Sequence, residues 1–203
     1  MISKKILPFF SYAFHPIFIS VYAAFFYFFV NATYYSSPQK YFAILQIIII
    51  TVVLPMLFVV LLRAMGQFNS MMVVSISQRK IPLILQCFLT IVLIRKSITL
   101  ENFPEFHFFF LGGLISTIIA LILLFFRSKA SLHLVAISAL TVFVTGLSIH
   151  NQFSTSYWIA FFVFMNGVVA SSRLETKAHT PKELIIGFFL GTIPQLSLLP
   201  FWL

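Results

Sequence analysis

The residues best suited to chemistry lie together near the C-terminus, in residues 172–183. This twelve-residue stretch, SRLETKAHTPKE, places Arg173 six residues before His179 and Glu183 four residues after it, in a chain of which only 8% is charged. An imidazole can attack phosphorus, fixed cations can neutralise charge on phosphoryl oxygens, and a carboxylate can fix the imidazole tautomer through its second ring nitrogen. The spacing therefore predicts half of a phosphate-handling site.

Two further polar clusters flank apolar runs earlier in the chain. One is Arg79-Lys80-Ile81-Pro82, and the other runs from Lys129 to His133. A predicted helical hairpin separates each cluster from the next, so all three can meet at one end of a helix bundle. A second imidazole at such a site could protonate the departing oxygen.

Composition indicates the elements that must position these clusters. Of the 203 residues, 61% are hydrophobic, and 8% charged is far below the roughly one quarter usual in soluble domains. The apolar runs are long and continuous, which predicts an all-α, polytopic transmembrane helix bundle of six to seven spans. We expect one transmembrane domain over residues 1–203, with two N-terminal spans in 1–62 and a core in 63–203.

Seven apolar runs are the predicted spans. They cover about residues 6–30, 41–62, 81–94, 106–126, 130–149, 157–171 and 184–202, and His15-Pro16 interrupts the first of them. The third run is short for a membrane span, which needs roughly 20 residues. It can cross a bilayer only if Lys80 and Arg95 extend their charged ends to the interfaces.

Basic residues are distributed unevenly between the two ends of this bundle. Ten lie on the side of the N-terminus: Lys4, Lys5, Arg63, Arg79, Lys80, Arg127, Lys129, Arg173, Lys177 and Lys182. Three lie on the other side: Lys40, Arg95 and Lys96. The bias predicts a bacterial inner or plasma membrane protein whose N-terminus and motif face are cytoplasmic. A phosphate site would also gather basic residues around it, so such a site would be a second reason for the excess of lysine and arginine on this side.

The charge pattern narrows the partners. The net charge is +9, and the basic residues sit in short loops beside spans, which favours anionic headgroups or phosphates and argues against nucleic acid. Cys87 is the single cysteine, so no disulfide within the chain and no thiolate metal site is expected.

Glu101, Glu105 and His107 fall on the opposite face without a predicted partner cluster, so we expect no metal there. His150 begins a predicted polar turn.

Residues 172–191 resemble the third signature of the type 2 phosphatidic acid phosphatase superfamily. That signature is Ser-Arg, five residues, His, three residues and an acid, followed by glycines; its counterparts here are Ser172, Arg173, His179, Glu183, Gly187 and Gly191. Ser131-Leu132-His133 is similar to the Ser-Gly-His of the second signature, and Arg79-Lys80-Ile81-Pro82 is a weaker match to the first. The resemblance covers roughly residues 63–195.

The resemblance implies roles for individual residues. His179 would be the nucleophile that forms a phosphohistidine, Glu183 would orient it, and His133 would act as general acid. The remaining candidates would bind substrate: Arg173, Ser131, Arg79, Lys80, Ser172 and Lys129. The family uses neither metal nor organic cofactor, and its members act on membrane lipid phosphates and isoprenyl diphosphates.

Departures from the family pattern leave a second function open. Met72 or Val73 stands where the first signature has lysine, Leu132 replaces glycine, Ala130 replaces proline and Glu183 replaces aspartate. These changes are compatible with a catalytically inactive relative that serves as a structural or lipid-binding subunit of a membrane complex. A transporter has less support, because no internal repeat is visible and no charge lies at mid-membrane.

Several residues have simpler interpretations. Thr180 and Glu183 form a predicted capping box, a role that would compete with orientation of His179. His133 fits the first turn of a helix capped by Ser128. Lys177 and Lys182 fit interfacial anchors. His15, inside an apolar run, has no assigned function.

Overall fold

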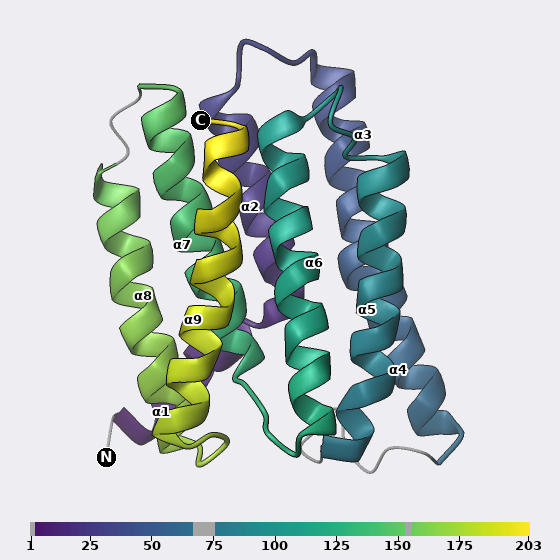
Figure 1. Cartoon of the computed structure of the whole chain (residues 1–203), viewed down its shortest axis with the longest axis vertical. Coiled ribbons are helices and arrows are strands. Elements are labelled where there is room, and N and C mark those ends of the chain that lie inside the picture. The colour runs from purple at the N-terminus through teal and green to yellow at the C-terminus, as the bar shows by residue number, and fades with distance from the viewer. Residues whose placement is uncertain (1–2, 67–75, 153–155) are drawn as a thin grey trace.

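The computed structural model describes residues 3–66, 76–152 and 156–203, and leaves out the side chains of 3–6 and 76–78. Every regular element in these ranges is a helix, which confirms the all-α class. Met72 and Val73 lie outside the described residues. The elements, shown in Figure 1, are α1 (Ser3–Ala13), α2 (Pro16–Val30), α3 (Ser37–Ile48), the π-helix η1 (Ile49–Val53), α4 (Leu54–Ala64), α5 (Ile76–Lys96), α6 (Pro104–Phe125), α7 (Leu132–His150), α8 (Ser156–Glu175), α9 (Pro181–Leu198) and the 3₁₀ turn η2 (Leu199–Phe201).

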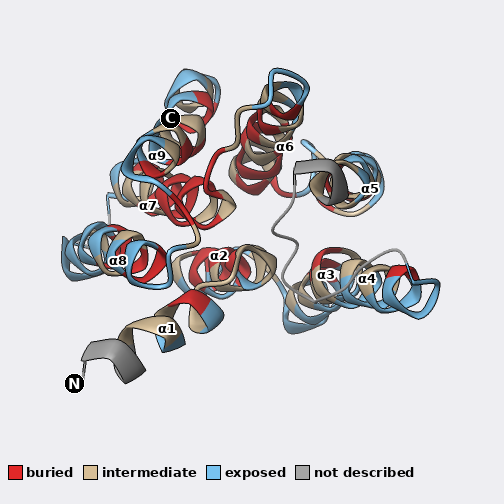
Figure 2. Cartoon of the chain, turned by 90° about the horizontal axis from the view of Figure 1, so that it is seen from below, coloured by how far each residue is buried: buried red, intermediate tan, exposed pale blue. Residues whose placement is uncertain are grey.

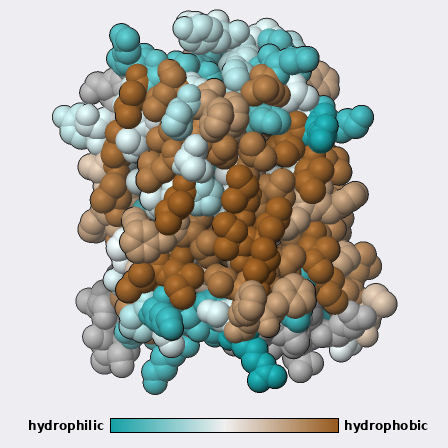
Figure 3. All heavy atoms as spheres, in the orientation of Figure 1, coloured by the Kyte–Doolittle hydropathy of each residue, from teal (hydrophilic) through white to brown (hydrophobic). Residues whose placement is uncertain are grey.

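Five continuous helical segments of the described chain are long and apolar enough to cross a membrane: Ser37–Ala64, Pro104–Phe125, Leu132–His150, Ser156–Glu175 and Pro181–Phe201. The bent pair α1 and α2 makes a sixth when it is counted as one span. On the face drawn in Figure 3, apolar residues occupy the middle of the molecule and polar residues gather at its two ends. The chain is therefore an integral membrane protein, and six spans match the lower end of the predicted range.

The predicted third span is the one that fails this criterion. Its helix, α5, has 21 residues and runs alongside α6, but it carries Arg79 and Lys80 near one end and Arg95 and Lys96 at the other. The helix is longer than the apolar run of residues 81–94, because the charged residues continue it in both directions. At 1.5 Å per residue it measures about 30 Å.

The N-terminal run, predicted as one span, is two helices that meet at an angle of 66°. His15 lies between them with extended backbone angles, and Pro16 begins α2. A residue before proline is pushed out of the helical region, and proline is well suited to the first helical position, so the His-Pro pair produces the break. In Figure 1, α1 lies across the end of the bundle that carries the N-terminus.

The helix at the centre of the bundle is α7. In its membrane-spanning stretch 61% of the residues are buried, a larger share than in any other candidate span of the described chain. Figure 2 shows buried residues on the facing sides of α2, α6, α7 and α9 and exposed residues outside. An aromatic cluster in this core surrounds Tyr27, Phe106 and Phe143; the Tyr27 and Phe106 rings stack with centroids 4.9 Å apart. The outward apolar side chains suit lipid contact.

Glycines bring α9 close to α7. A Cβ at Gly187 would lie 2.6 Å from the Ser131 carbonyl oxygen, and one at Gly191 would overlap the Val135 carbonyl and the Ser138 hydroxyl. The Ser138 hydroxyl donates across this contact to the Phe188 carbonyl oxygen at 3.0 Å. Small residues that let backbones approach are a common means of helix association in membranes. This contact sets the position of α9 and of the loop before it.

Candidate functional site

The predicted polar clusters meet at the end of the bundle that carries the N-terminus (Figure 1). The start of α5, the α6–α7 connection and the α8–α9 connection all lie at this end. Arg79 and Arg173 both lie close enough to His179 for their positive charges to act on its imidazole, and the charge of Arg173 also acts on His133. The structure therefore places the two arginines and the two histidines near one another at this end, while their functional roles stay predictions.

The turn between Arg173 and His179 has well-defined geometry. The Ala178 N–H donates to the Arg173 carbonyl oxygen at 3.1 Å and the Lys177 N–H donates to the Leu174 carbonyl oxygen at 2.9 Å. Lys177 adopts a φ of 51°, in the left-handed region. This is the Schellman pattern that closes a helix C-terminus, with lysine where glycine is usual. It turns the chain from the end of α8 back to the start of α9.

Glu183 caps α9 and binds His179 at the same time. Its Oε2 accepts from His179 Nδ1–H at 2.8 Å and from the Thr180 backbone N–H at 3.2 Å, while the Thr180 hydroxyl accepts from the Glu183 N–H at 3.4 Å. Its other oxygen, Oε1, lies 3.6 Å from Lys129 Nζ. The expected competition between capping and orientation was therefore wrong, because one carboxylate oxygen accepts both hydrogen bonds.

His179 is held as a neutral imidazole at ordinary pH. Burial lowers the pKa of His179 to about 4; the Glu183 hydrogen bond opposes this shift, and the charges of Arg79 and Arg173 add to it. A neutral ring that donates through Nδ1 to Glu183 carries its lone pair on Nε2. The arrangement therefore leaves the Nε2 lone pair available to accept a hydrogen bond or to act as a nucleophile.

Two buried polar atoms beside the histidines have no hydrogen-bond partner within the described residues. They are Arg173 Nε, on a side chain 7% exposed, and Ser131 Oγ, on a side chain with no exposure. Buried polar groups without partners cost free energy, and an arginine donor is the group that best recognises phosphate oxygens. Both atoms are of a type that contacts the oxygens of anionic ligands.

Ser131 also fixes the register of α7 against α9. It is the N-cap residue of α7, although its side chain makes no capping bond, and its backbone N–H donates to the Glu183 carbonyl oxygen at 3.0 Å. The expected cap, Ser128, was wrong: three residues separate it from the first helical residue, Leu132. The free hydroxyl of Ser131 is thus held beside the residue that binds His179.

His133 lies in the first turn of α7 and is 9% exposed. Its Nε2 is 3.0 Å from the carbonyl oxygen of Ser11, and its ring stands perpendicular to that of His15, with centroids 5.1 Å apart. A carbonyl oxygen only accepts, so Nε2 carries a proton, and Nδ1 is the atom left to exchange a proton with a ligand.

Besides Lys129, which faces Glu183, two of the predicted substrate contacts have other partners. Ser172 donates its hydroxyl to the Leu7 carbonyl oxygen at 2.6 Å and accepts from the Ser11 hydroxyl, which fastens α1 to α8. Lys80 places its ammonium group 4.3 Å from the centre of the Phe125 ring. Ser172 therefore holds the scaffold, and the lysine contacts the end of α6.

Sequence reasoning noted the interruption at His15-Pro16 but missed the contribution of α1 to the site. Ser11 and His15 both contact His133 although they precede it by more than a hundred residues. The available signal was the His-Pro pair inside an apolar run, which marks a helix break and exposes polar groups that a continuous span would bury.

The opposite end of the bundle holds an unpredicted polar cluster. Glu105 accepts a hydrogen bond from the Tyr27 hydroxyl at 2.8 Å and lies 3.3 Å from His150 Nε2; the Tyr27 and Tyr35 hydroxyls are 2.6 Å apart. The expectation that Glu105 has no partner cluster was wrong. The predicted polar turn does follow His150, at residues 151 and 152, and the His150 side chain pairs with Glu105 as well. Within the described residues no three histidine, cysteine or acidic side chains are placed to hold a metal ion.

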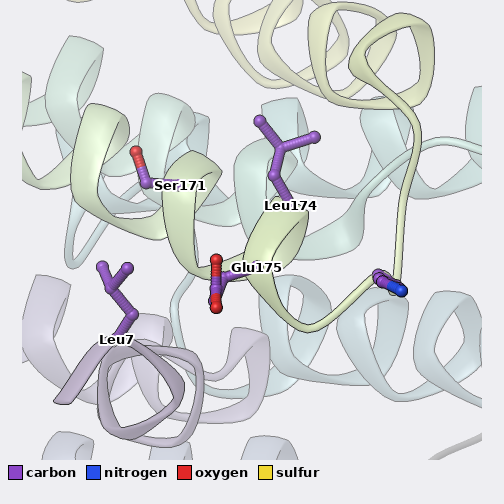
Figure 4. A pocket seen from close by; sticks show the side chains of 5 residues that line it. Leu7, Ser171, Leu174 and Glu175 are labelled. Atoms are coloured by element: carbon purple, nitrogen blue, oxygen red, sulfur yellow. The ribbon is translucent and has the colours of Figure 1, made fainter. Parts of the chain in front are cut away.

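A pocket of about 530 Å³ lies beside the site, between α1 and α8. Leu7 of α1 and Ser171, Leu174 and Glu175 of α8 surround it (Figure 4), and Lys177 completes the lining. Its mixed apolar and charged lining adjoins Ser172 and Arg173 in the chain.

Comparison of the chain with protein-family models, curated proteins and solved structures finds no match.

Proposed function

We propose that this protein is an integral membrane phosphatase or phosphotransferase that acts on a lipid-linked phosphate through a phosphohistidine at His179. One observation carries the proposal: a neutral, carboxylate-oriented His179 within Coulombic range of two arginines, beside unpaired buried donors. The resemblance of residues 172–191 to a phosphatase signature is independent support.

The first chemical step follows from the tautomer. The lone pair on His179 Nε2 attacks phosphorus, an N–P bond forms, and the bond from phosphorus to the leaving oxygen breaks. The ring then carries a positive charge, which the Glu183 carboxylate stabilises through Nδ1–H. Arg173 and Arg79 neutralise charge on the phosphoryl oxygens, and the Ser131 hydroxyl donates a hydrogen bond to one of them.

His133 supplies and recovers the proton. In its protonated form it keeps Nε2–H on the Ser11 carbonyl oxygen and gives the Nδ1 proton to the leaving oxygen. In the second step the neutral Nδ1 takes a proton from water, whose oxygen attacks phosphorus as the N–P bond breaks. Phosphate leaves and His179 is restored, so protons and charge balance over the cycle.

A lipid-linked substrate suits the position of the site. The cluster lies at the end of membrane-spanning helices, so a phosphate at the headgroup level can reach it while its apolar chain stays among the outward apolar side chains. A phosphatidate-type lipid and an isoprenyl diphosphate share this chemistry.

The second candidate function is a catalytically inactive subunit that binds lipid phosphate within a membrane complex. The branched side chain of Leu132, where the resembling signature has glycine, favours it, because it narrows the approach of a phosphate to the backbone. Stable co-purification of partner chains without phosphate release would select this alternative.

The experiment measures phosphate release by protein purified in lipid nanodiscs, with phosphatidate and an isoprenyl diphosphate assayed separately. The wild type should release phosphate and form an acid-labile phosphoenzyme, and His179→Ala should abolish both. His107→Ala is the matched control, because His107 bonds the Ile98 carbonyl oxygen near the opposite end of the bundle. Activity that survives in His179→Ala would refute the nucleophile assignment.

A further inference from the structure

His15 contributes a third imidazole to the site, from an element outside the predicted motifs. Its ring contacts that of His133 edge to face, with centroids 5.1 Å apart, and it lies within Coulombic range of Arg173. It is therefore next to the proton-transfer residue and near the principal phosphate-binding residue of the proposed mechanism.

The break between α1 and α2 fixes the tautomer of this ring. His15 is the N-cap residue of α2, and its Nδ1 accepts the Ile17 backbone N–H at 3.3 Å. A ring nitrogen that accepts a hydrogen bond carries no proton, so the proton of the neutral ring is on Nε2. No acceptor for Nε2–H is found among the described residues.

Capping alone does not require histidine at this position. Asparagine, aspartate and serine are the preferred N-cap residues, and each would accept the same N–H with a shorter side chain. Histidine adds a second nitrogen that donates on the far side of the ring, which a serine or asparagine cap does not provide.

We propose that His15 is a substrate-binding residue whose Nε2–H donates a hydrogen bond to an oxygen of the bound phosphate. The ring stays neutral throughout, because α2 uses the Nδ1 lone pair, and no proton is transferred by His15. This inference rests on the proposed function for the identity of the substrate, but phosphate binding can be measured without turnover.

The test measures, by calorimetry, the binding of inorganic phosphate and of orthovanadate to the full-length protein in nanodiscs. His15→Asn keeps an N-cap acceptor and removes the Nε2–H donor. We expect it to retain the thermal stability of the wild type and to weaken anion binding by about tenfold or more, as expected for loss of a hydrogen bond to a charged group. His107→Asn, the same substitution near the other end, should bind as the wild type does.

Two further variants separate a binding role from a structural one. His15→Asp also caps α2 but places a negative charge beside the anion, so it should bind more weakly than His15→Asn at equal stability. His15→Ala should lose stability as well as binding. Wild-type affinity in His15→Asn would overturn the inference, as would absence of any anion binding by the wild type. Binding that depends on His15 without phosphate release would support it while refuting catalysis.

Discussion

At the scale of single residues, the site depends on one carboxylate with three partners. Glu183 receives the His179 Nδ1–H and the Thr180 backbone N–H on one oxygen and faces Lys129 with the other. The start of α9 and the His179–Glu183 pair are therefore a single structural unit. Its position follows from the spacing of three residues from the cap to the acid and four from the histidine to the acid.

Substitution of Glu183 by glutamine separates these two roles. Glutamine preserves the capping box, so the melting temperature should change little. The positive charge that forms on His179 during attack would lose its counter-charge, and phosphate release should fall about tenfold to a hundredfold. Thr180→Ala is the converse variant: it should lower stability by about 1 kcal/mol and leave most activity. Equal activity losses in the two variants would contradict the assignment.

The buried His179 also predicts a pH effect on stability. Its pKa is about 4 when folded, against 6.5 as the ordinary value. Between these values the unfolded chain binds a proton that the folded chain does not, so the free energy of unfolding falls as the pH falls from about 6.5 towards 4. The contribution amounts to about 3 kcal/mol. Thermal melting at several pH values should show a smaller decline for His179→Gln than for the wild type.

At the scale of elements, the contact of α7 with α9 determines whether the two histidines face one site. His133 lies in the first turn of α7, while His179 and Glu183 lie at the start of α9. Ser131 and Gly187 touch near these starts, and Val135 and Gly191 touch one turn further along. Separation of the helices at the second contact would therefore also move the first.

Gly191→Ala tests this dependence. The added methyl group overlaps the Val135 carbonyl, a backbone atom that cannot rotate away, so the helices must separate. We expect a loss of about 1–3 kcal/mol of stability, as for overpacked cores, together with reduced phosphate release. Gly113→Ala on α6 is the control, since a Cβ there meets nothing within 4 Å. Unchanged melting of Gly191→Ala would show that the contact is looser than described.

Helix positions were largely predictable from the sequence, but the path of the N-terminal run was not. The predicted runs 41–62 and 106–126 match Ser37–Ala64 and Pro104–Phe125 within a few residues, because hydrophobic length and proline mark them clearly. Hydrophobicity alone did not distinguish one span from the bent pair of α1 and α2. The His-Pro pair contained that information through backbone sterics, which a hydrophobicity pattern does not include.

At the scale of the whole molecule, the two polar ends differ in how predictable they were. The grouping of Arg79, Arg173, His133 and His179 at one end could be predicted because these residues lie in short spaced motifs separated by hairpins, whereas phosphate binding there stays a proposal. The cluster of Tyr27, Glu105 and His150 joins three helices that are far apart in sequence, so no short sequence motif could predict it. The same applies to Ser11 with Ser172, since only the folded bundle brings α1 against α8.

Orientation in the membrane is the last property that the charge distribution predicts. The end with the proposed phosphate site and the N-terminus carries the larger share of lysine and arginine, so it should face the cytoplasm. A substrate would then be processed in the cytoplasmic leaflet, and released phosphate would remain inside the cell. The single cysteine makes this testable, because Cys87→Ala leaves a background without thiols.

Single cysteines introduced at Lys182 and Asn102 report on opposite ends, since both positions are exposed, one at the start of α9 and one just before α6. In intact bacterial cells, a membrane-impermeant maleimide should label Asn102→Cys and should label Lys182→Cys only after the cells are opened. The reverse pattern would place the site outside the cytoplasm. The basic residues around His179 would then be explained by phosphate binding alone, since the positive-inside rule would no longer account for them.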